Sequence, residues 1–195
     1  MKETSYSLGV LLGQNLKSQI DINDLDMEAI SKGIIDILKG DDLDISMEEA
    51  NYNAQIYLQQ AAAKKANAAQ AEEKKFMEEN AARPGIVKRD SGLQYEVLVE
   101  GTGSIPKATD KVVAHYEGRL LSGKVFDSSY KRGQPATFPV NGLIQGWQEA
   151  LQIMPVGSKW RLYIPSELGY GARGAGADIP GGATLIFDLE LIQIQ

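Results

Sequence analysis

The distribution of proline and glycine divides this chain of 195 residues into two parts that must fold differently. All seven prolines and 16 of the 20 glycines lie at or after Pro84. Because proline ends helices and glycine favours turns, residues 1–83 can form long helices, whereas residues 84–195 require short strands and turns. The net charge of −6 belongs to the first part, which holds 9 Lys+Arg against 15 Asp+Glu, while the second part holds 11 of each. We therefore predict an α+β fold with an all-α N-terminal region.

Apolar residues at helical spacing predict two short helices and one long helix in the first part. Leucines recur every four residues over 8–16, and a second apolar stripe lies over 30–38. A capping-box sequence at 46–49 opens a segment without glycine or proline that reaches Arg83. Beyond Ala63 this segment is rich in Ala, Lys, Glu and Gln, so most of it is expected to be a solvated spacer.

These stripes predict a domain that pairs with a second copy. We expect a helical dimerisation region over residues 1–45, a connecting helix over 46–83 and a C-terminal domain over 84–195. Three helices with so few large apolar residues make a thin core, and a homodimer through residues 1–83 buries the remaining apolar faces. The same stripes also permit a monomeric three-helix appendage.

The second part alternates short apolar runs with turn signals, which is typical of an antiparallel sheet. Strands are predicted over 93–99, 111–120, 160–164 and 184–194, separated by Gly-containing turns. A short amphipathic helix fits between Gln145 and Gln152. We therefore expect an antiparallel sheet wrapped around one short helix.

The composition argues against several classes of protein. There is no cysteine and only one histidine, His115, which argues against thiol chemistry, a catalytic triad and a multi-histidine metal centre. Residues 169–174 match the dinucleotide pattern GxGxxG, but no strand and helix can flank them. Acidic triplets at 21–23 and 42–44 lack the Gly and Glu of a calcium loop. We expect no cofactor, no metal and no nucleic-acid partner.

The sequence also predicts where the protein acts. No segment approaches the roughly 20 apolar residues of a membrane span, and the first residues lack the apolar run of a signal peptide. We expect a cytoplasmic protein without a membrane span, or a periplasmic one if a leader has been removed.

Aromatic residues recur around one lone carboxylate in the second part. Val125-Phe126-Asp127-Ser128-Ser129 is accompanied by His115-Tyr116, Gly146-Trp147 and Tyr170-Gly171, with no nucleophile beside them. This pattern predicts an apolar binding cup. Ser128 and Ser129 are expected to be turn residues, and His115 a hydrogen-bonded structural residue.

With these motifs, residues 91–195 resemble the FKBP-type peptidyl-prolyl isomerase domain. Further matches are Gly142-Leu143-Ile144-Gln145-Gly146-Trp147, Met154-Pro155-Val156-Gly157 and Ala183-Thr184-Leu185-Ile186-Phe187. The first part, from Tyr6-Ser7-Leu8-Gly9 to the long helix, is similar to the dimerisation part of the bacterial group that includes the macrophage infectivity potentiator. The resemblance implies an enzyme that isomerises Xaa-Pro bonds in folding proteins.

The resemblance also implies a role for each matching residue. Asp127 is expected to polarise or orient the twisted amide, as the only carboxylate facing it, while the Tyr170 hydroxyl and the Ile144 N–H donate to substrate carbonyls. The expected pocket residues are Trp147 as the floor and Tyr116, Phe126, Leu143, Ile144, Tyr170 and Phe187 as the walls. Implied partners are proline-containing unfolded or nascent polypeptides and macrolide inhibitors of the FK506 type.

Two departures from the family pattern bear on the pocket. Where many members have an aromatic residue after a proline, this chain has Pro135-Ala136, so Phe138 is expected in the strand core and the pocket to be wider. Glycines around Pro180 predict a mobile flap over residues 174–182. A second function stays open, in which the domain is a chaperone or scaffold that binds proline-containing segments and turnover is incidental.

Overall fold

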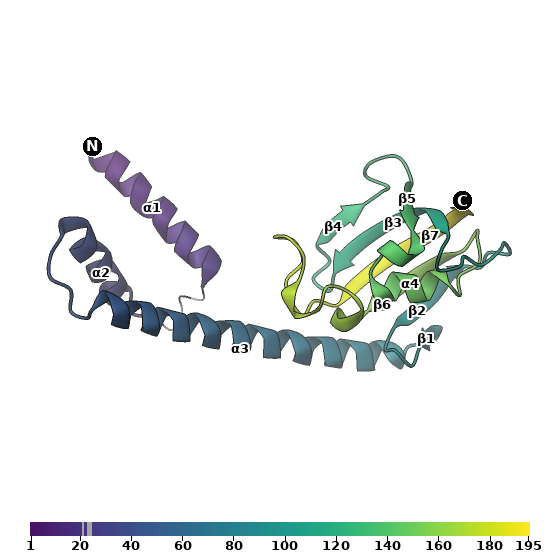
Figure 1. Cartoon of the computed structure of the whole chain (residues 1–195), viewed down its shortest axis with the longest axis horizontal. Coiled ribbons are helices and arrows are strands. Elements are labelled where there is room, and N and C mark those ends of the chain that lie inside the picture. Colours follow the sequence, from purple (N-terminus) through teal and green to yellow (C-terminus); the bar gives the residue numbers. More distant parts are fainter. Residues whose placement is uncertain (21, 23–24) are drawn as a thin grey trace. The chain divides into compact units, whose positions relative to one another are not determined.

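The computed structural model describes residues 1–20, 22 and 25–195 (Figure 1). The acidic triplet at 21–23 therefore falls largely outside the described residues, as does Asp24. The chain forms two compact units, Met1–Lys65 and Ala66–Gln195. The α+β fold class predicted from the sequence is confirmed, with helices first and an antiparallel sheet after them.

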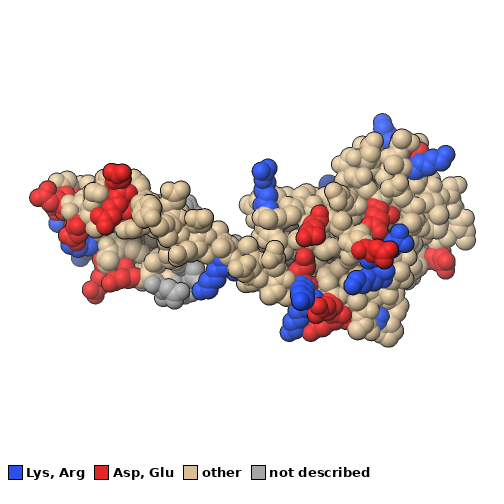
Figure 2. Space-filling model, turned by 60° about the horizontal axis from the view of Figure 1, so that its bottom comes forward, with Lys and Arg blue, Asp and Glu red and all other residues tan. Residues whose placement is uncertain are grey.

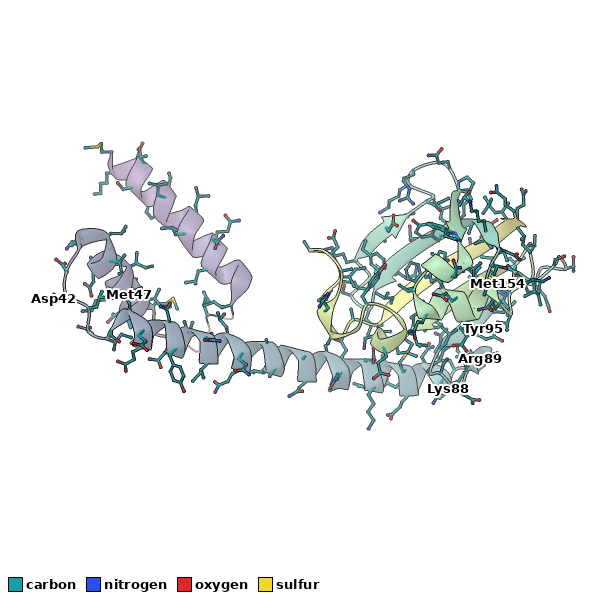
Figure 3. All side chains as sticks on the ribbon, viewed as in Figure 1. Asp42, Met47, Lys88, Arg89, Tyr95 and Met154 are labelled. Atoms are coloured by element: carbon teal, nitrogen blue, oxygen red, sulfur yellow. The ribbon has the colours of Figure 1, made fainter. Side chains whose placement is uncertain are left out.

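Three helices form the N-terminal unit, and their ends follow the predicted caps. They are α1 (Lys2–Gln19), α2 (Met27–Lys39) and the first part of α3 (Met47–Ala81), whose starting residue is labelled in Figure 3. The Asp26 carboxylate accepts hydrogen bonds from two N–H groups at the start of α2, and Gly40 ends that helix with a φ of 72°. The Ser46 hydroxyl accepts from the Glu49 N–H, 3.1 Å away, at the start of α3.

Large apolar side chains remain exposed in the N-terminal unit. Leu11 on α1 is 62% exposed, and Leu38 on α2 is 77% exposed. Every fully buried apolar side chain in the described part of the chain lies between Leu93 and Leu191. On the face shown in Figure 2, this unit carries mainly acidic charges, whereas both signs are mixed over the C-terminal unit. The N-terminal unit therefore has exposed apolar faces rather than a buried core.

The C-terminal unit is built on a seven-stranded antiparallel sheet in the order β1-β2-β6-β7-β3-β4, with β5 also paired to β3. The strands are β1 (Ile86–Lys88), β2 (Gln94–Val99), β3 (Lys111–Leu120), β4 (Val125–Ser128), β5 (Ala136–Pro139), β6 (Lys159–Ile164) and β7 (Leu185–Ile194). The four predicted strands correspond to β2, β3, β6 and β7. Alternate residues of β3 and β7 are buried, which places one face of each strand on the core.

Helix α4 (Gln145–Leu151) lies across this sheet and closes the core (Figure 1). Gly146 permits the close approach, because a Cβ atom there would lie 2.6 Å from Ile164 Cγ2 on β6. Trp147 and Leu151 face the sheet and are buried, as is Met154 after the helix (Figure 3). The helix thus fixes Trp147 at the centre of the sheet face.

The last turns of α3 belong to the C-terminal unit. The Asn80 amide donates to Gln94 Oε1 at 2.8 Å, and Gln94 Nε2 donates to the Met77 carbonyl at 2.8 Å. The Phe76 ring lies 5.9 Å from that of Tyr163 on β6. The C-terminal unit therefore begins before Pro84, the position at which the distribution of proline and glycine changes. The functional division into residues 1–45, 46–83 and 84–195 stays a prediction.

Candidate functional site

A cavity of about 560 Å³ opens between α4, the sheet and the segment before β7. The fourteen residues that line it are Tyr116, Phe126, Asp127, Phe138, Gly142, Leu143, Ile144, Trp147, Tyr170, Ala175, Gly176, Asp178, Ile179 and Phe187. All eight predicted site residues are among them. The structure thus brings together side chains from β3, β4, β7, α4 and two loops, while the role of each stays a prediction.

Three other rings pack edge to face around Trp147, which lines the cavity. The ring centroids of Tyr116 and Phe187 lie 5.3 and 5.2 Å from that of Trp147, with interplanar angles of 83° and 85°. Phe138 lies 5.9 Å away at 82°. Such geometry places the positive edge of one ring on the negative face of another. These four rings therefore form an apolar box that lines the cavity.

Gly118 allows two walls of this box to meet. Phe126 and Phe187 pack edge to face, 5.5 Å apart, over the β3 backbone. A Cβ atom at Gly118 would lie 2.5 Å from Phe187 and 2.6 Å from Phe126. The glycine of the motif His115–Gly118 is thus required by the packing of the two rings, since its own φ is not positive.

Asp127 is held at the edge of the cavity by two donors. The Tyr116 hydroxyl donates to its carboxylate at 2.6 Å, and Arg132 donates to the other oxygen. Burial alone would raise the pKa of Asp127, but these hydrogen bonds and the Arg132 charge outweigh it and lower that pKa. Burial and the hydrogen bond to Asp127 raise the pKa of Tyr116. Near neutral pH the pair is therefore a carboxylate and a neutral phenol.

Two donors face the cavity without an acceptor in the described part of the chain. The Ile144 N–H precedes the first turn of α4, and no hydrogen bond within the described residues uses it. No hydrogen bond among the described residues uses the Tyr170 hydroxyl either, and this residue is 40% exposed. Gln148 fixes the loop that carries Ile144, since its Nε2 donates to the Leu143 carbonyl at 2.6 Å.

The flap over the cavity is folded by its own hydrogen bonds. Ala175 and Ile179 form an isolated antiparallel bridge, and Gly182 N–H donates to the Gly171 carbonyl at 2.9 Å. Gly174 has a φ of 70°, and a Cβ atom there would lie 2.2 Å from the Ile179 carbonyl oxygen. Glycine is required here for a tight turn, and Ile179 is buried against the cavity.

The structure changes several expectations about the site. Phe138 packs against the core, as expected, and it also lines the cavity, while the wider pocket expected from Ala136 stays a prediction. Asp178 is a second lining carboxylate, paired with Lys124 at 2.8 Å, so Asp127 is not the only acid facing the cavity. The sequence motifs did not indicate Arg132 as a partner of Asp127, although it follows Asp127 by five residues, in the adjoining turn.

Of the two serines expected to be turn residues, Ser129 lies in a turn and Ser128 is the last residue of a strand. Ser128 ends β4, and Ser129 is fully buried in the following turn. The Ser129 hydroxyl accepts from Tyr116 N–H at 2.7 Å and donates to its carbonyl at 3.1 Å. It also lies 3.0 Å from His115 Nδ1, whose ring stacks on Tyr130. His115 is thus hydrogen-bonded outside the cavity, as expected.

The cavity is lined mainly by aromatic and aliphatic side chains. Its described lining residues include no histidine, lysine, serine or cysteine, and no group of metal-binding side chains occurs among the residues that were described. No described helix is long and apolar enough to cross a membrane. The fold and site together define an α+β protein with an aromatic pocket on an antiparallel sheet.

Comparisons with known proteins identify the family. The family model "FKBP-type peptidyl-prolyl cis-trans isomerase" matches residues 103–192, and "Domain amino terminal to FKBP-type peptidyl-prolyl isomerase" matches residues 1–97. The "FKBP-type 22 kDa peptidyl-prolyl cis-trans isomerase" of Escherichia coli K12 is 46% identical, over 98% of this chain and 94% of that protein. This chain therefore belongs to the FKBP-type peptidyl-prolyl cis-trans isomerases and catalyses Xaa-Pro isomerisation.

Two further comparisons extend over almost the whole chain. The "Outer membrane protein MIP" of Legionella longbeachae is 41% identical, with 98% of this chain and 84% of that protein aligned. The crystal structure of FkpA from Escherichia coli matches with a TM-score of 0.78 and 33% identity, covering 99% of this chain and 95% of that one. The similarity to this solved structure therefore includes the N-terminal helices of the chain.

Proposed function

We propose that the aromatic cavity accelerates isomerisation by holding the Xaa-Pro amide away from water. Rotation of a peptide bond meets a barrier of about 18–20 kcal/mol because the planar amide is resonance-stabilised. The twisted amide loses that resonance and its charge separation, so an apolar site favours it relative to water. The box of rings around Trp147 is the observation that supports this mechanism most directly.

In this mechanism the proline ring lies on Trp147, between the walls formed by Tyr116, Phe126 and Phe187. The Ile144 N–H and the Tyr170 hydroxyl donate to the substrate carbonyls on either side of the rotating bond. Asp127, kept ionised by Arg132, orients the twisted amide. The reaction breaks no covalent bond, so it needs no proton donor or nucleophile, which agrees with the cavity's composition.

A conservative tyrosine variant tests the mechanism. Tyr170→Phe removes one donor and keeps the ring, and a lost hydrogen bond of about 1.4 kcal/mol lowers kcat/KM by about tenfold. The control is Tyr130→Phe, because Tyr130 stacks on His115 and does not line the cavity. Rates are measured on Xaa-Pro tetrapeptides with the full chain. Unchanged turnover in Tyr170→Phe and in Asp127→Ala contradicts the proposed roles.

The proposed ligands are proline-containing segments of unfolded or nascent chains and FK506-type macrolides, which present a similar apolar ring to Trp147. A macrolide is expected to compete with tetrapeptide substrate. The chaperone alternative is favoured by the exposed apolar faces of the N-terminal unit. It is supported if Tyr170→Phe loses peptide turnover and still prevents aggregation of an unfolded protein as well as the unmodified chain.

We also propose that residues 1–83 form a homodimer whose arms hold the client. Leu8, Leu11 and Leu12 on α1 are 58 to 62% exposed, and Ile37 on α2 is 56% exposed. Exposed apolar faces of this extent mark association surfaces. A second copy with the same faces can cover them in a two-fold arrangement.

Light scattering tests the dimer against the monomer mass of 21.2 kDa. Leu12→Asp combined with Ile37→Asp is expected to reduce a dimeric mass to the monomer value, whereas Gln59→Asp, at an exposed polar position of α3, leaves it unchanged. The dissociated variant should retain peptide turnover and lose rate on a proline-limited refolding protein. A monomeric mass for the unmodified chain contradicts the dimer.

The cytoplasmic location expected from the sequence stays a proposal, and one relative carries the name of an outer membrane protein. Fractionation of cells that express the full-length gene product distinguishes a cytoplasmic from a periplasmic location.

A further inference from the structure

Glu73, in the last third of α3, accepts hydrogen bonds from both ends of the segment 166–184, which contains the flap. Its Oε2 accepts from the Ser166 N–H at 2.5 Å and from the Thr184 hydroxyl at 3.1 Å. Its Oε1 accepts from the Ser166 hydroxyl at 3.2 Å. Ser166 follows β6, and Thr184 immediately precedes β7. One carboxylate thus joins the entry and the exit of the segment between them.

The segment joined in this way supplies one side of the cavity. Tyr170, Ala175, Gly176, Asp178 and Ile179 all line it and all lie between Ser166 and Thr184. The 3₁₀ helix η2 (Ser166–Leu168) begins at the serine that Glu73 binds, and the next one, η3 (Gly171–Arg173), follows Tyr170. The position of Tyr170 therefore depends on where η2 is anchored.

The two partners of Glu73 are buried, so water cannot readily replace the carboxylate. Ser166 is 7% exposed and Thr184 is 3% exposed. Buried donors that lose their acceptor are costly, and a segment held by them shifts to find new partners. Neighbouring contacts fix the helix itself, since Ala69 lies against Gly182 and Phe76 against Tyr163.

We propose that Glu73 is a positioning residue for isomerisation, which acts through Ser166 and Thr184 to hold Tyr170 and the flap against the cavity. The last turns of α3 are then part of the machinery of the isomerase rather than only a spacer. This proposal rests on the proposed function, in which Tyr170 donates a hydrogen bond to the substrate.

The test compares Glu73→Ala, Glu73→Gln and Glu72→Ala in the full chain. Glu73→Ala removes every acceptor, and we expect a loss of about fivefold or more in kcat/KM on tetrapeptides. Glu73→Gln should stay within twofold of the unmodified chain, because one amide oxygen in the place of Oε2 can accept from both Ser166 and Thr184. Glu72 is exposed on the same turn and is the matched control.

Hydrogen exchange separates positioning from general stability. In Glu73→Ala the Gly182 amide, which bonds within the flap to Gly171, should exchange at least tenfold faster. Leu189, in the centre of β7, should keep its protection, and Glu72→Ala should change neither amide. If Glu73→Ala does not fold, Thr184→Val supplies the same test, with a loss of about twofold or more in kcat/KM and faster Gly182 exchange.

The outcomes distinguish this proposal from the proposed function. Normal kcat/KM in Glu73→Ala, with Tyr170→Phe impaired, overturns the role of Glu73 alone. Equal losses in Glu73→Ala and Glu72→Ala, or faster exchange at Leu189 as well as Gly182, also overturn it. Normal turnover in Tyr170→Phe, Asp127→Ala and Glu73→Ala together contradicts both.

Discussion

Gly118→Ala is expected to destabilise the C-terminal unit through the two rings that form a wall of the cavity. The new Cβ would lie 2.5 Å from Phe187 Cε1 and 2.6 and 2.7 Å from Phe126 Cε2 and Cζ. Contacts below 3.0 Å force the rings apart, and overpacking of this kind costs about 1–3 kcal/mol. The lower entropy of the unfolded alanine chain returns about 0.4–1 kcal/mol. With both terms at mid-range, about 2 against about 0.7 kcal/mol, the expected net loss is about 1.3 kcal/mol.

Urea denaturation followed by near-ultraviolet circular dichroism measures this loss, because the affected side chains are aromatic. The midpoint should fall with the m-value unchanged. Phe126→Leu supplies the control, because a smaller side chain gives room to the new methyl group. The cost of Gly118→Ala should be lower in that background by at least 0.5 kcal/mol, as expected for residues in contact. An unchanged or higher midpoint for Gly118→Ala refutes the packing argument.

Three further results are expected. Because hydrogen bonds lower the pKa of Asp127 in the folded chain, the stability it contributes is present above its unfolded pKa and lost as pH falls through the folded value. Arg132→Ala removes one of the groups that lower this pKa, so the loss of stability on acidification should begin at a higher pH. Thermal melts across pH 2–6 measure this shift, and Lys131→Ala should leave it unchanged. Ser129→Ala leaves the buried Tyr116 N–H without its acceptor and should cost about 1–3 kcal/mol in denaturant unfolding. Asp26→Ala removes the α2 cap and should cost about 1 kcal/mol, read from the helical signal at 222 nm.

The longer elements could be predicted because each carries enough residues for its period to be visible. The four predicted strands are six or ten residues long in the structure, and the predicted helix over 145–152 ends one residue early, as α4. The strands β1, β4 and β5 have only three or four residues. Segments this short hold at most two periods of alternation, too few to identify a strand from the sequence, and each pairs with a longer neighbouring strand.

The sequence predicts those site residues that belong to motifs, because a motif is recognised from the type and order of its side chains. It does not predict residues that only folding brings close to the motifs. All eight residues that the motifs named are among the fourteen that line the cavity. The motifs did not indicate that Phe138 lines it, nor that Asp178 joins it from the flap. Both results depend on register between strands and on a tight turn that glycine permits. Arg132 had a local signal, since a cation five residues after Asp127 can return to it across the turn.

Glu73 shows why a charge-balanced helix can conceal a functional contact. Lysines and glutamates alternate around it, which predicts a solvated face, and its partners lie 93 and 111 residues away. A signal nevertheless exists, because Phe76 and Met77 follow Glu73 by three and four residues and Asn80 by seven. That spacing places all four on one side of a helix. Two large apolar residues in an otherwise polar helix thus mark the face that packs on the sheet, and an acid on that face is an acceptor for buried donors rather than a solvated charge.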